Sequence, residues 1–146
     1  MPAAAPTASG WEPEGKIAAI GLSNVTIAQL DETLTVVPVT AAQNRLSYAD
    51  PRDLPTAVAC AERGIAYVAH STLAEPAGAP LQVSLRVARR HGASVQRVLL
   101  AWLQTQVPVA VRLVGASRPA SIRDSAAPLD LPAQDLAELS DAWRGL

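Results

Sequence analysis

The sequence predicts an α/β protein with a parallel sheet, which we interpret as half of a TIM-type (β/α)8 barrel. Apolar runs alternate with amphipathic stretches about four times along the 146 residues. Each run is almost continuously apolar, as in strands that are buried on both faces of a parallel sheet. A complete barrel takes about 250 residues, so this length suits about four β/α units and one further helix at the carboxyl end.

The first unit is an apolar run over residues 17–22 followed by a helix. Thr26 and Gln29 have the spacing of a capping box, in which each residue bonds to the backbone of the other. Beyond them, apolar residues recur at helical spacing, namely Ile27, Leu30 and Leu34. This pattern predicts a helix that starts immediately after Thr26.

The later units repeat the same order of strand and helix. Gly64 marks the end of a helix, and Pro119 stands at a favourable first-turn position of another. The predicted strands cover 36–44, 65–71 and 109–115. The predicted helices cover 55–63, 82–90, 94–106, a segment from 119 onward, and 131–146.

Charge and composition exclude several classes of protein. The net charge is −1 with scattered Lys and Arg residues, so we expect no nucleic-acid partner. No apolar run reaches about 18 residues, so we expect no membrane span. A single cysteine, Cys60, cannot form an internal disulfide and fits a reducing, cytoplasmic location.

The chain divides into a leader and one domain. Residues 1–13 are rich in Ala and Pro without the basic and apolar regions of a signal peptide, so we expect a disordered leader. Residues 14–146 carry all the predicted strands and helices. We therefore expect one half-barrel domain over 14–146.

An isolated four-stranded parallel sheet leaves two strand edges and one face uncovered. A second copy of the chain could close an eight-stranded barrel about a two-fold axis, which predicts a homodimer. The alternative is a monomeric open α/β sandwich whose last helix folds across the gap. The sequence favours the homodimer and leaves the second arrangement open.

Polar residues follow each predicted strand at the end where ligands bind in such folds. The stretches concerned are "EGKIAAIGLSN", "AAQNRLSYADPRD", "GIAYVAHSTL", "ARRHGASVQRVLLAWLQ" and "LVGASRPASIRDS". Together they resemble the carboxyl-terminal half of the aldo-keto reductases, from about residue 14 to residue 139. The resemblance implies a half-barrel of that family.

The resemblance also implies which residues face a cofactor, NADP(H). Ser23, Asn24 and Gln43 match residues that hold the nicotinamide carboxamide, which offers both a donor and an acceptor. Ser71 matches the loop that passes the pyrophosphate. Ser117 and Arg118 match the site of the adenosine 2′-phosphate, just before the start of a helix. Each residue also has a purely structural reading as a cap, turn or helix start.

Three departures from the family pattern suggest a different function. The family's catalytic tetrad of Asp, Tyr, Lys and His belongs to the first half of the barrel, so we expect this chain to lack it. His70 stands where the family usually has an aromatic ring that stacks on the nicotinamide. Arg112 lies where proline is common; it points inward if Val111 and Leu113 face the helices, and otherwise snorkels outward.

These departures favour a cofactor-independent enzyme that moves protons on a small apolar metabolite, by cyclisation, isomerisation or dehydration. The side chains expected to carry this chemistry are His70, Arg112, Tyr48 and Asn44. The pKa of histidine, about 6.5, suits proton transfer near neutrality. The alternative is an NADP(H)-binding module, or a reductase subunit whose partner supplies the tetrad.

Overall fold

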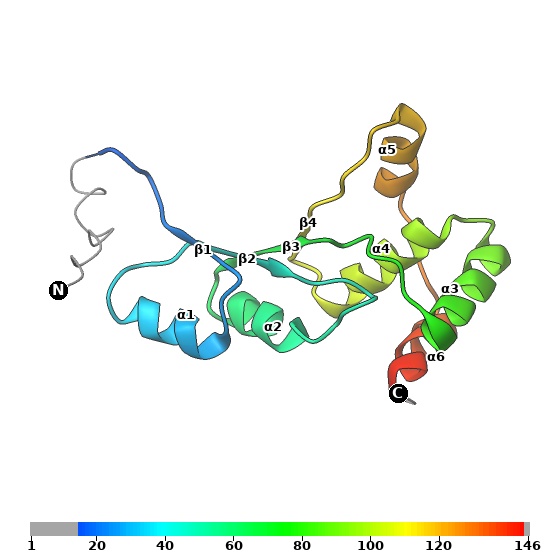
Figure 1. The fold of residues 1–146 in the computed structure, drawn as a ribbon, viewed down its shortest axis with the longest axis horizontal. Helices are drawn as coiled ribbons and strands as arrows, with labels where there is room; N and C mark the ends of the chain where they lie inside the picture. Colours follow the sequence, from blue (N-terminus) through cyan, green and yellow to red (C-terminus); the bar gives the residue numbers. More distant parts are fainter. Residues whose placement is uncertain (1–14, 145–146) are drawn as a thin grey trace.

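The structure is a computed structural model that describes residues 15–144. Four parallel strands and six helices alternate along it (Figure 1). The strands are β1 (Gly21–Ser23), β2 (Ala41–Arg45), β3 (Ala66–His70) and β4 (Val111–Arg112). The helices are α1 (Ile27–Leu34), α2 (Leu54–Glu62), α3 (Gly78–His91), α4 (Val95–Gln106), α5 (Pro119–Ala126) and α6 (Ala133–Arg144). This order confirms the predicted half-barrel class; the leader predicted over residues 1–13 lies outside the described residues.

The four strands lie in the sheet in the same order as in the chain, and every neighbouring pair is parallel. Ser23 is opposite Gln43, and Gln43 is opposite Val68. Two residues further along the strands, Arg45 is opposite His70. The carboxyl ends of β1, β2 and β3 therefore lie side by side at one end of the sheet, which we call the rim.

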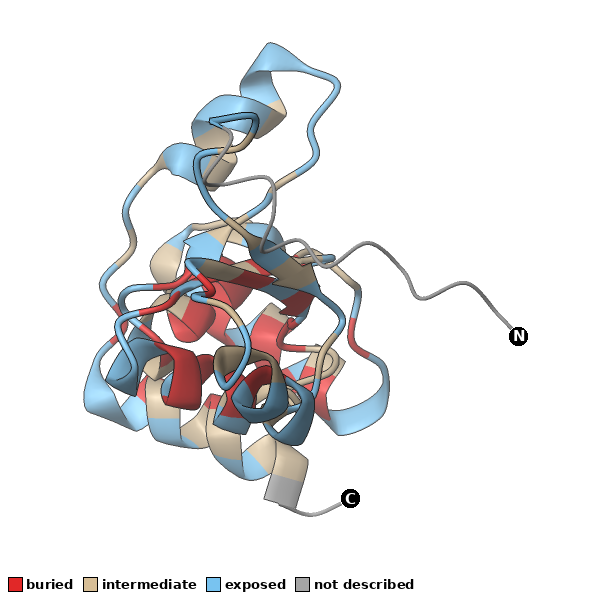
Figure 2. Ribbon diagram, turned by 90° about the vertical axis from the view of Figure 1, so that its left-hand side faces the viewer, coloured by how far each residue is buried: buried red, intermediate tan, exposed pale blue. Residues whose placement is uncertain are grey.

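The hydrophobic core lies between one face of the sheet and the helices. Alternate strand residues point into it, as shown by the fully buried Ala42, Tyr67 and Ala69. Helices α1 and α2 lie below the sheet in Figure 1, and the buried residues in Figure 2 gather on this side. Helix α5 contributes no buried residue and stands away from the core (Figure 2).

Local sequence signals place the helix ends. The capping box predicted for Thr26 and Gln29 is present, with the Gln29 backbone N–H donating to Thr26 Oγ1 at 3.2 Å. Helix α3 ends at Gly92, whose φ of +57° is a left-handed conformation that glycine adopts at little cost. Helix α4 starts after Ser94, which accepts a hydrogen bond from the backbone N–H of Arg97.

A cluster of charged side chains joins α3 to α6. Asp135 is 2% exposed, and one of its carboxylate oxygens lies 2.5 Å from His91 Nε2 while the other accepts from Arg90. Glu138 accepts from Arg86 at 2.8 Å and from Arg90 at 3.0 Å. Buried carboxylates are stable only when paired in this way, so the cluster holds the last helix against the domain.

Helices of the described residues cover only one face of the sheet. Within residues 15–144 the strands are buried only on the face toward the helices, and the alternate residues on the other face are open. β1 and β4 are also shorter than predicted, because each has a pairing neighbour on one side only. The apolar runs in the sequence therefore include residues that no helix of residues 15–144 covers.

Helix α6 packs against α3, on the side of the sheet that the helices already cover. The arrangement in which the last helix folds across the open face is therefore wrong, because its apolar residues, such as the fully buried Leu139, belong to the helical side of the core. None of the helices within residues 15–144 has both the length and the apolar character needed to span a bilayer.

Candidate functional site

A chain of four hydrogen-bonded side chains lies on the rim. His70 Nε2 lies 3.2 Å from Asn24 Oδ1, and His70 Nδ1 lies 3.0 Å from Ser71 Oγ. Asn24 Nδ2 in turn donates to Ser23 Oγ at 3.2 Å. With Nε2 protonated, the ring donates to Asn24 and accepts from the Ser71 hydroxyl, so both nitrogens are satisfied. The rim therefore holds the imidazole in one orientation.

Two residues of this chain have an unusual backbone conformation. Asn24 has a φ of +54° and Ser71 a φ of +57°, both in the left-handed region. They are the only residues other than glycine with positive φ in the described part of the chain. Such conformations cost about 1 kcal/mol or more and gather at ligand sites. Their positions after β1 and β3 point to the rim as a functional surface.

Gln43 lies beside this chain on the open face of β2. Its side chain is exposed, and its register neighbour on β1 is Ser23. The Asn24 backbone N–H donates to the Gln43 carbonyl at 3.0 Å, which fixes the two strands at this point. The three residues predicted to face the nicotinamide carboxamide are thus brought together by adjacent strands.

Asn44 faces the opposite way from Gln43. It is 4% exposed, and its side chain bonds both backbone groups of Val25, accepting from N–H at 3.0 Å and donating to the carbonyl at 2.7 Å. It also donates to Asp53 Oδ2 at 2.8 Å. The same oxygen accepts from Tyr67 Oη at 2.5 Å, where burial is the largest cause raising the pKa of the phenol. Asn44 lies on the helical side of the sheet, so these bonds tie β1 to the start of α2.

Tyr48 is also in the core, and its ring is fully buried. Its hydroxyl donates to the Leu139 carbonyl of α6 at 2.9 Å, and its ring packs edge-on against Trp102 and Trp143. Burial, with a smaller effect of Glu138, raises the pKa of Tyr48 to about 12. The structure therefore places Tyr48 between the sheet end and α6, where it anchors the helix.

Of the two orientations that the sequence leaves open for Arg112, the structure shows the one that points away from the open face of the sheet. Val111 and Leu113 are 52% and 45% exposed on the open face, so the residue between them points to the helices. The Arg112 guanidinium donates to Gln104 of α4, and burial lowers its pKa. The apolar residues of this segment would suit either face of the sheet. In the structure Val111 and Leu113 lie on the open face.

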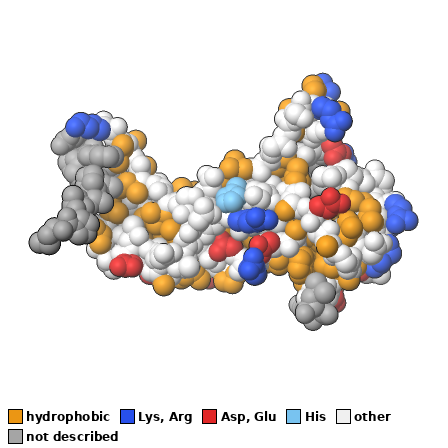
Figure 3. Space-filling model, viewed as in Figure 1, with side chains coloured by type: hydrophobic (Ala, Val, Ile, Leu, Met, Phe, Trp, Pro, Cys, Tyr) orange, Lys and Arg blue, Asp and Glu red, His pale blue; other side chains and the backbone are white. Residues whose placement is uncertain are grey.

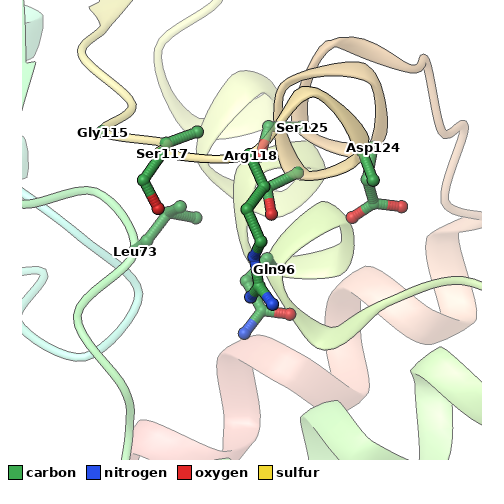
Figure 4. Close-up of a pocket in the computed structure, with 10 residues that line it drawn as sticks. Leu73, Gln96, Gly115, Ser117, Arg118, Asp124 and Ser125 are labelled. Carbon is green, nitrogen blue, oxygen red and sulfur yellow. The ribbon is translucent and has the colours of Figure 1, made fainter.

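A pocket of about 590 Å³ lies at the start of α5, between the loop after β4, the loop after β3 and the first turn of α4 (Figure 4). It contains both residues predicted for the adenosine 2′-phosphate, Ser117 and Arg118. Figure 4 shows the Arg118 side chain extending from the start of α5 in the direction of Gln96. The remaining lining residues are Leu73, Gly115, Ala116, Ala120, Ser121, Asp124 and Ser125.

The start of α5 has the properties of an anion site. Its N-cap is Arg118, and no side chain of the described residues caps the helix. Pro119 has no N–H, so the first-turn donors that face outward are those of the next residues, Ala120 and Ser121. Helix N–H groups, the helix dipole and a guanidinium all favour a phosphate here. The donor set therefore fits the phosphate end of NADP(H).

The Asp124 carboxylate also lines this pocket, but it is paired with side chains of α4 and its N-cap and is not a free negative charge facing a phosphate. It accepts hydrogen bonds from Ser94 Oγ and, at 2.5 Å, from Arg97 Nη2. These bonds, that of Ser94 first, hold the pKa of Asp124 below its ordinary value of 3.8. Because the folded-state pKa is lowered, this stabilisation is present above pH 3.8 and is lost as the pH falls through the lowered pKa. Asp124 thus braces α5 against α4 at neutral pH.

Two parts of the site were missed by sequence reasoning. Gln96 lies on the exposed side of α4 and carries no motif, so nothing in the sequence places it beside Arg118. Asp53 precedes a helix as an N-cap residue would, yet its side chain bonds Asn44 and Tyr67 instead of the helix. Among residues 15–144 no cluster of His, Cys, Asp and Glu suits a metal ion.

Comparison with known proteins agrees with this geometry. The chain is 35% identical over 116 residues to pyridoxine 4-dehydrogenase of Escherichia coli K12, a match that covers 78% of this chain and 40% of that protein. It is 27% identical over 131 residues to an uncharacterized oxidoreductase of Schizosaccharomyces pombe, covering 88% of this chain and 43% of that one. The chain thus spans less than half the length of both relatives.

Solved structures share the fold. A thermostable aldo-keto reductase in complex with the inhibitor epalrestat superposes with a TM-score of 0.80 at 24% identity, over 92% of this chain and 52% of that one. A Bombyx mori aldo-keto reductase in complex with NADP superposes with a TM-score of 0.73 at 16% identity, over 92% and 47%. The family model for the aldo/keto reductases matches residues 9–144. This chain belongs to the aldo/keto reductase family.

Proposed function

We propose that the chain binds NADP(H) and forms the cofactor-binding half of an aldo-keto reductase. The observation that carries this proposal is the pocket at the start of α5, where Arg118 and uncapped N–H groups meet. The negatively charged 2′-phosphate of the cofactor suits the positive charge of Arg118 and the N–H groups at the start of α5. Ser23, Asn24 and Gln43 on the rim offer the donors and acceptors that a carboxamide needs.

The bound cofactor supplies or accepts a hydride, and the chain's own residues position it. Ser23, Asn24 and Gln43 orient one end, and His70 stands beside them with its ring fixed by Asn24 and Ser71. Reducing a carbonyl also needs a proton donor. Both tyrosine hydroxyls of the described residues are bonded inside the core, so we propose that the catalytic tetrad comes from other chain segments.

The relatives support this proposal. The Escherichia coli protein is named a dehydrogenase of pyridoxine, and two silkworm structures are complexes with NADPH or NADP. Since this chain spans about half of such proteins, a complete redox activity and its substrate are part of the proposal. A carbonyl or alcohol substrate would approach the rim, where the nicotinamide end is expected.

Cofactor-independent proton transfer is the second candidate. The observation in its favour is His70 at the carboxyl end of β3, whose two ring nitrogens are both hydrogen-bonded. This imidazole stands where the family resemblance leads one to expect a larger aromatic side chain that stacks on the nicotinamide. The other three residues expected for it do not surround this ring: Arg112 contacts α4, while Asn44 and Tyr48 are buried with their polar groups bonded. We therefore rank NADP(H) binding first.

Replacing Arg118 tests the proposal. We expect Arg118→Ala to weaken NADPH binding about tenfold, because an exposed charge-assisted bond to phosphate contributes roughly 1.4 kcal/mol. NADH, which has no 2′-phosphate, should lose little affinity in the same variant. The measurement is calorimetric titration of each cofactor into the full chain.

The matched control is Arg123→Ala. Arg123 is exposed on α5 in the last turn and does not line the pocket. It should leave NADPH affinity unchanged. Equal loss of NADPH and NADH binding in the Arg118 variant would contradict the assignment of the 2′-phosphate to this pocket. Lack of any cofactor binding by the unmodified chain would favour the chemistry centred on His70.

A reducing, cytoplasmic location is part of the proposed function. Cys60, the single cysteine, is a free thiol that is fully buried in the core, and burial raises its pKa. A thiol held in this state is protected from oxidation. NADP(H)-dependent chemistry suits the same compartment.

A further inference from the structure

Arg97 and Arg112 are the only partly buried arginines among residues 15–143, since all the others there are exposed. On the face of the molecule shown in Figure 3, the Lys and Arg side chains form small, separate groups at the surface. Arg97 is paired, because its Nη2 donates to Asp124 Oδ1 at 2.5 Å. Arg112 donates only to the neutral amide of Gln104, and no ion pair joins it to a carboxylate of residues 15–143. Arg112 is therefore a partly buried positive charge without a counter-ion in this part of the chain.

Both arginines line one pocket of about 280 Å³ between α4 and the end of α5. One wall is a single stripe of α4, whose residues lie three or four apart: Arg97, Leu100, Ala101 and Gln104. The opposite wall is the segment over residues 125–130, and Arg112 reaches the pocket from β4. The middle of the pocket is apolar, because it is formed by Leu100, Ala101, Pro128 and Leu129.

Gln104 fixes the position of the Arg112 guanidinium. Its Oε1 accepts from Arg112 Nη1, and its Nε2 donates to the Pro108 carbonyl at 2.6 Å, so both ends of the amide are bonded. A guanidinium has five N–H donors, and this bond uses one of them. The others suit the two oxygens of a carboxylate, which arginine binds in a bidentate manner. Burial lowers the pKa of Arg112 from its ordinary value of 12.5, and no carboxylate of the described residues offsets this effect.

The size and charge of the pocket indicate which anion it suits. An apolar cavity of about 150 Å³ holds benzene, so 280 Å³ is enough for a small ring that carries a carboxylate. Asp130 also lines the pocket, as an exposed carboxylate that forms no ion pair with either arginine. A doubly charged phosphate would be repelled by Asp130 more strongly than a singly charged carboxylate. The pocket therefore favours a monocarboxylate with an apolar body.

We infer that this pocket binds a small carboxylate, whose oxygens are held by Arg112 and whose apolar body packs on Leu100 and Leu129. The site is separate from the one proposed for the 2′-phosphate, because Arg118 does not line it and Ser125 is the only lining residue that the two pockets share. The inference requires neither NADP(H) nor a catalytic tetrad. It therefore stands or falls independently of the proposed function.

The test is an NMR titration of the full chain with benzoate, and with benzamide as its uncharged analogue. We expect saturable shifts of the backbone amides over residues 126–129 with benzoate, and binding at least about tenfold weaker with benzamide. Arg112→Gln should weaken benzoate binding about tenfold, while Arg112→Lys, which keeps the charge, should lose less. Arg89→Gln is the matched control, because Arg89 is exposed on α3 and does not line the pocket.

Asp130→Asn should have the opposite effect and tighten benzoate binding about twofold, because it removes a like charge at the pocket. This exposed position also keeps the test decisive if Arg112→Gln does not fold. Arg118→Ala should leave benzoate binding unchanged, and Arg112→Gln should leave NADPH binding unchanged. Absence of saturable shifts with benzoate, equal binding of benzamide, or loss of benzoate binding in Arg118→Ala would overturn the inference.

Discussion

Replacing Asp135 by Asn should lower the free energy of unfolding by about 3 kcal/mol, the lower end of the range for breaking a buried ion pair. Asp135 is 2% exposed and bonds both Arg90 and His91. The amide keeps the shape and removes the charge, which leaves the Arg90 guanidinium and the His91 ring without their common carboxylate. Arg90 retains Glu138 at 3.0 Å, and this keeps the loss from being larger.

Urea denaturation of the two proteins measures this difference. Asp130→Asn is the matched control, because Asp130 is an exposed carboxylate in the loop between α5 and α6. A surface change of this kind should stay within about 0.5 kcal/mol. Equal midpoints for the two variants would contradict the structural role assigned to the α3–α6 charge cluster.

The second large effect on stability is expected at Asn44. Its neighbour Gln43 is expected to affect cofactor binding instead. Asn44→Ala removes three hydrogen bonds and leaves the Val25 N–H and carbonyl without their side-chain partner, at a cost of about 2–4 kcal/mol of unfolding free energy. Gln43→Ala, on the open face one residue earlier, should cost less than about 0.5 kcal/mol.

Cofactor binding should show the reverse pattern. Gln43→Ala should weaken NADPH binding by several-fold, while folded Asn44→Ala should bind as the unmodified chain does. Thermal unfolding with and without NADPH measures both properties in one experiment. If Asn44→Ala were as stable as the unmodified chain, the structural role assigned to Asn44 would be wrong. The catalytic role predicted from the sequence would then be the better interpretation.

Sequence reasoning predicted the order of elements because each β/α unit carries its own local signals. The capping box at Thr26 and Gln29 and the turn after α2 at Gly64 depend on neighbouring residues only. Polar residues at or just beyond the carboxyl ends of strands were also located correctly, since parallel strands bring these ends to one rim. Ser23, Asn24, Gln43 and His70 therefore lie together as expected.

Side-chain orientation was harder to predict where both faces of a strand are apolar in sequence. The segment around Arg112 has aliphatic residues on either side, so its alternation does not tell which face is open. Tyr48 and Asp53 depend on contacts with distant segments, namely Leu139 on α6 and Tyr67 on β3. Such contacts follow from the packing of the whole domain and leave no periodic pattern in the sequence.

The binding of adenosine 2′,5′-bisphosphate tests the central claim most directly. This probe carries the 2′-phosphate and adenosine without the nicotinamide, so it reports on the Arg118 pocket alone and does not depend on the completeness of the rim. Calorimetric titration into the full chain at low salt should show saturable binding to one site per chain, weakened about tenfold by Arg118→Ala and unchanged by Arg123→Ala. Absence of saturable binding, or equal binding by all three proteins, would contradict the assignment of this chain as the NADP(H)-binding half of an aldo-keto reductase.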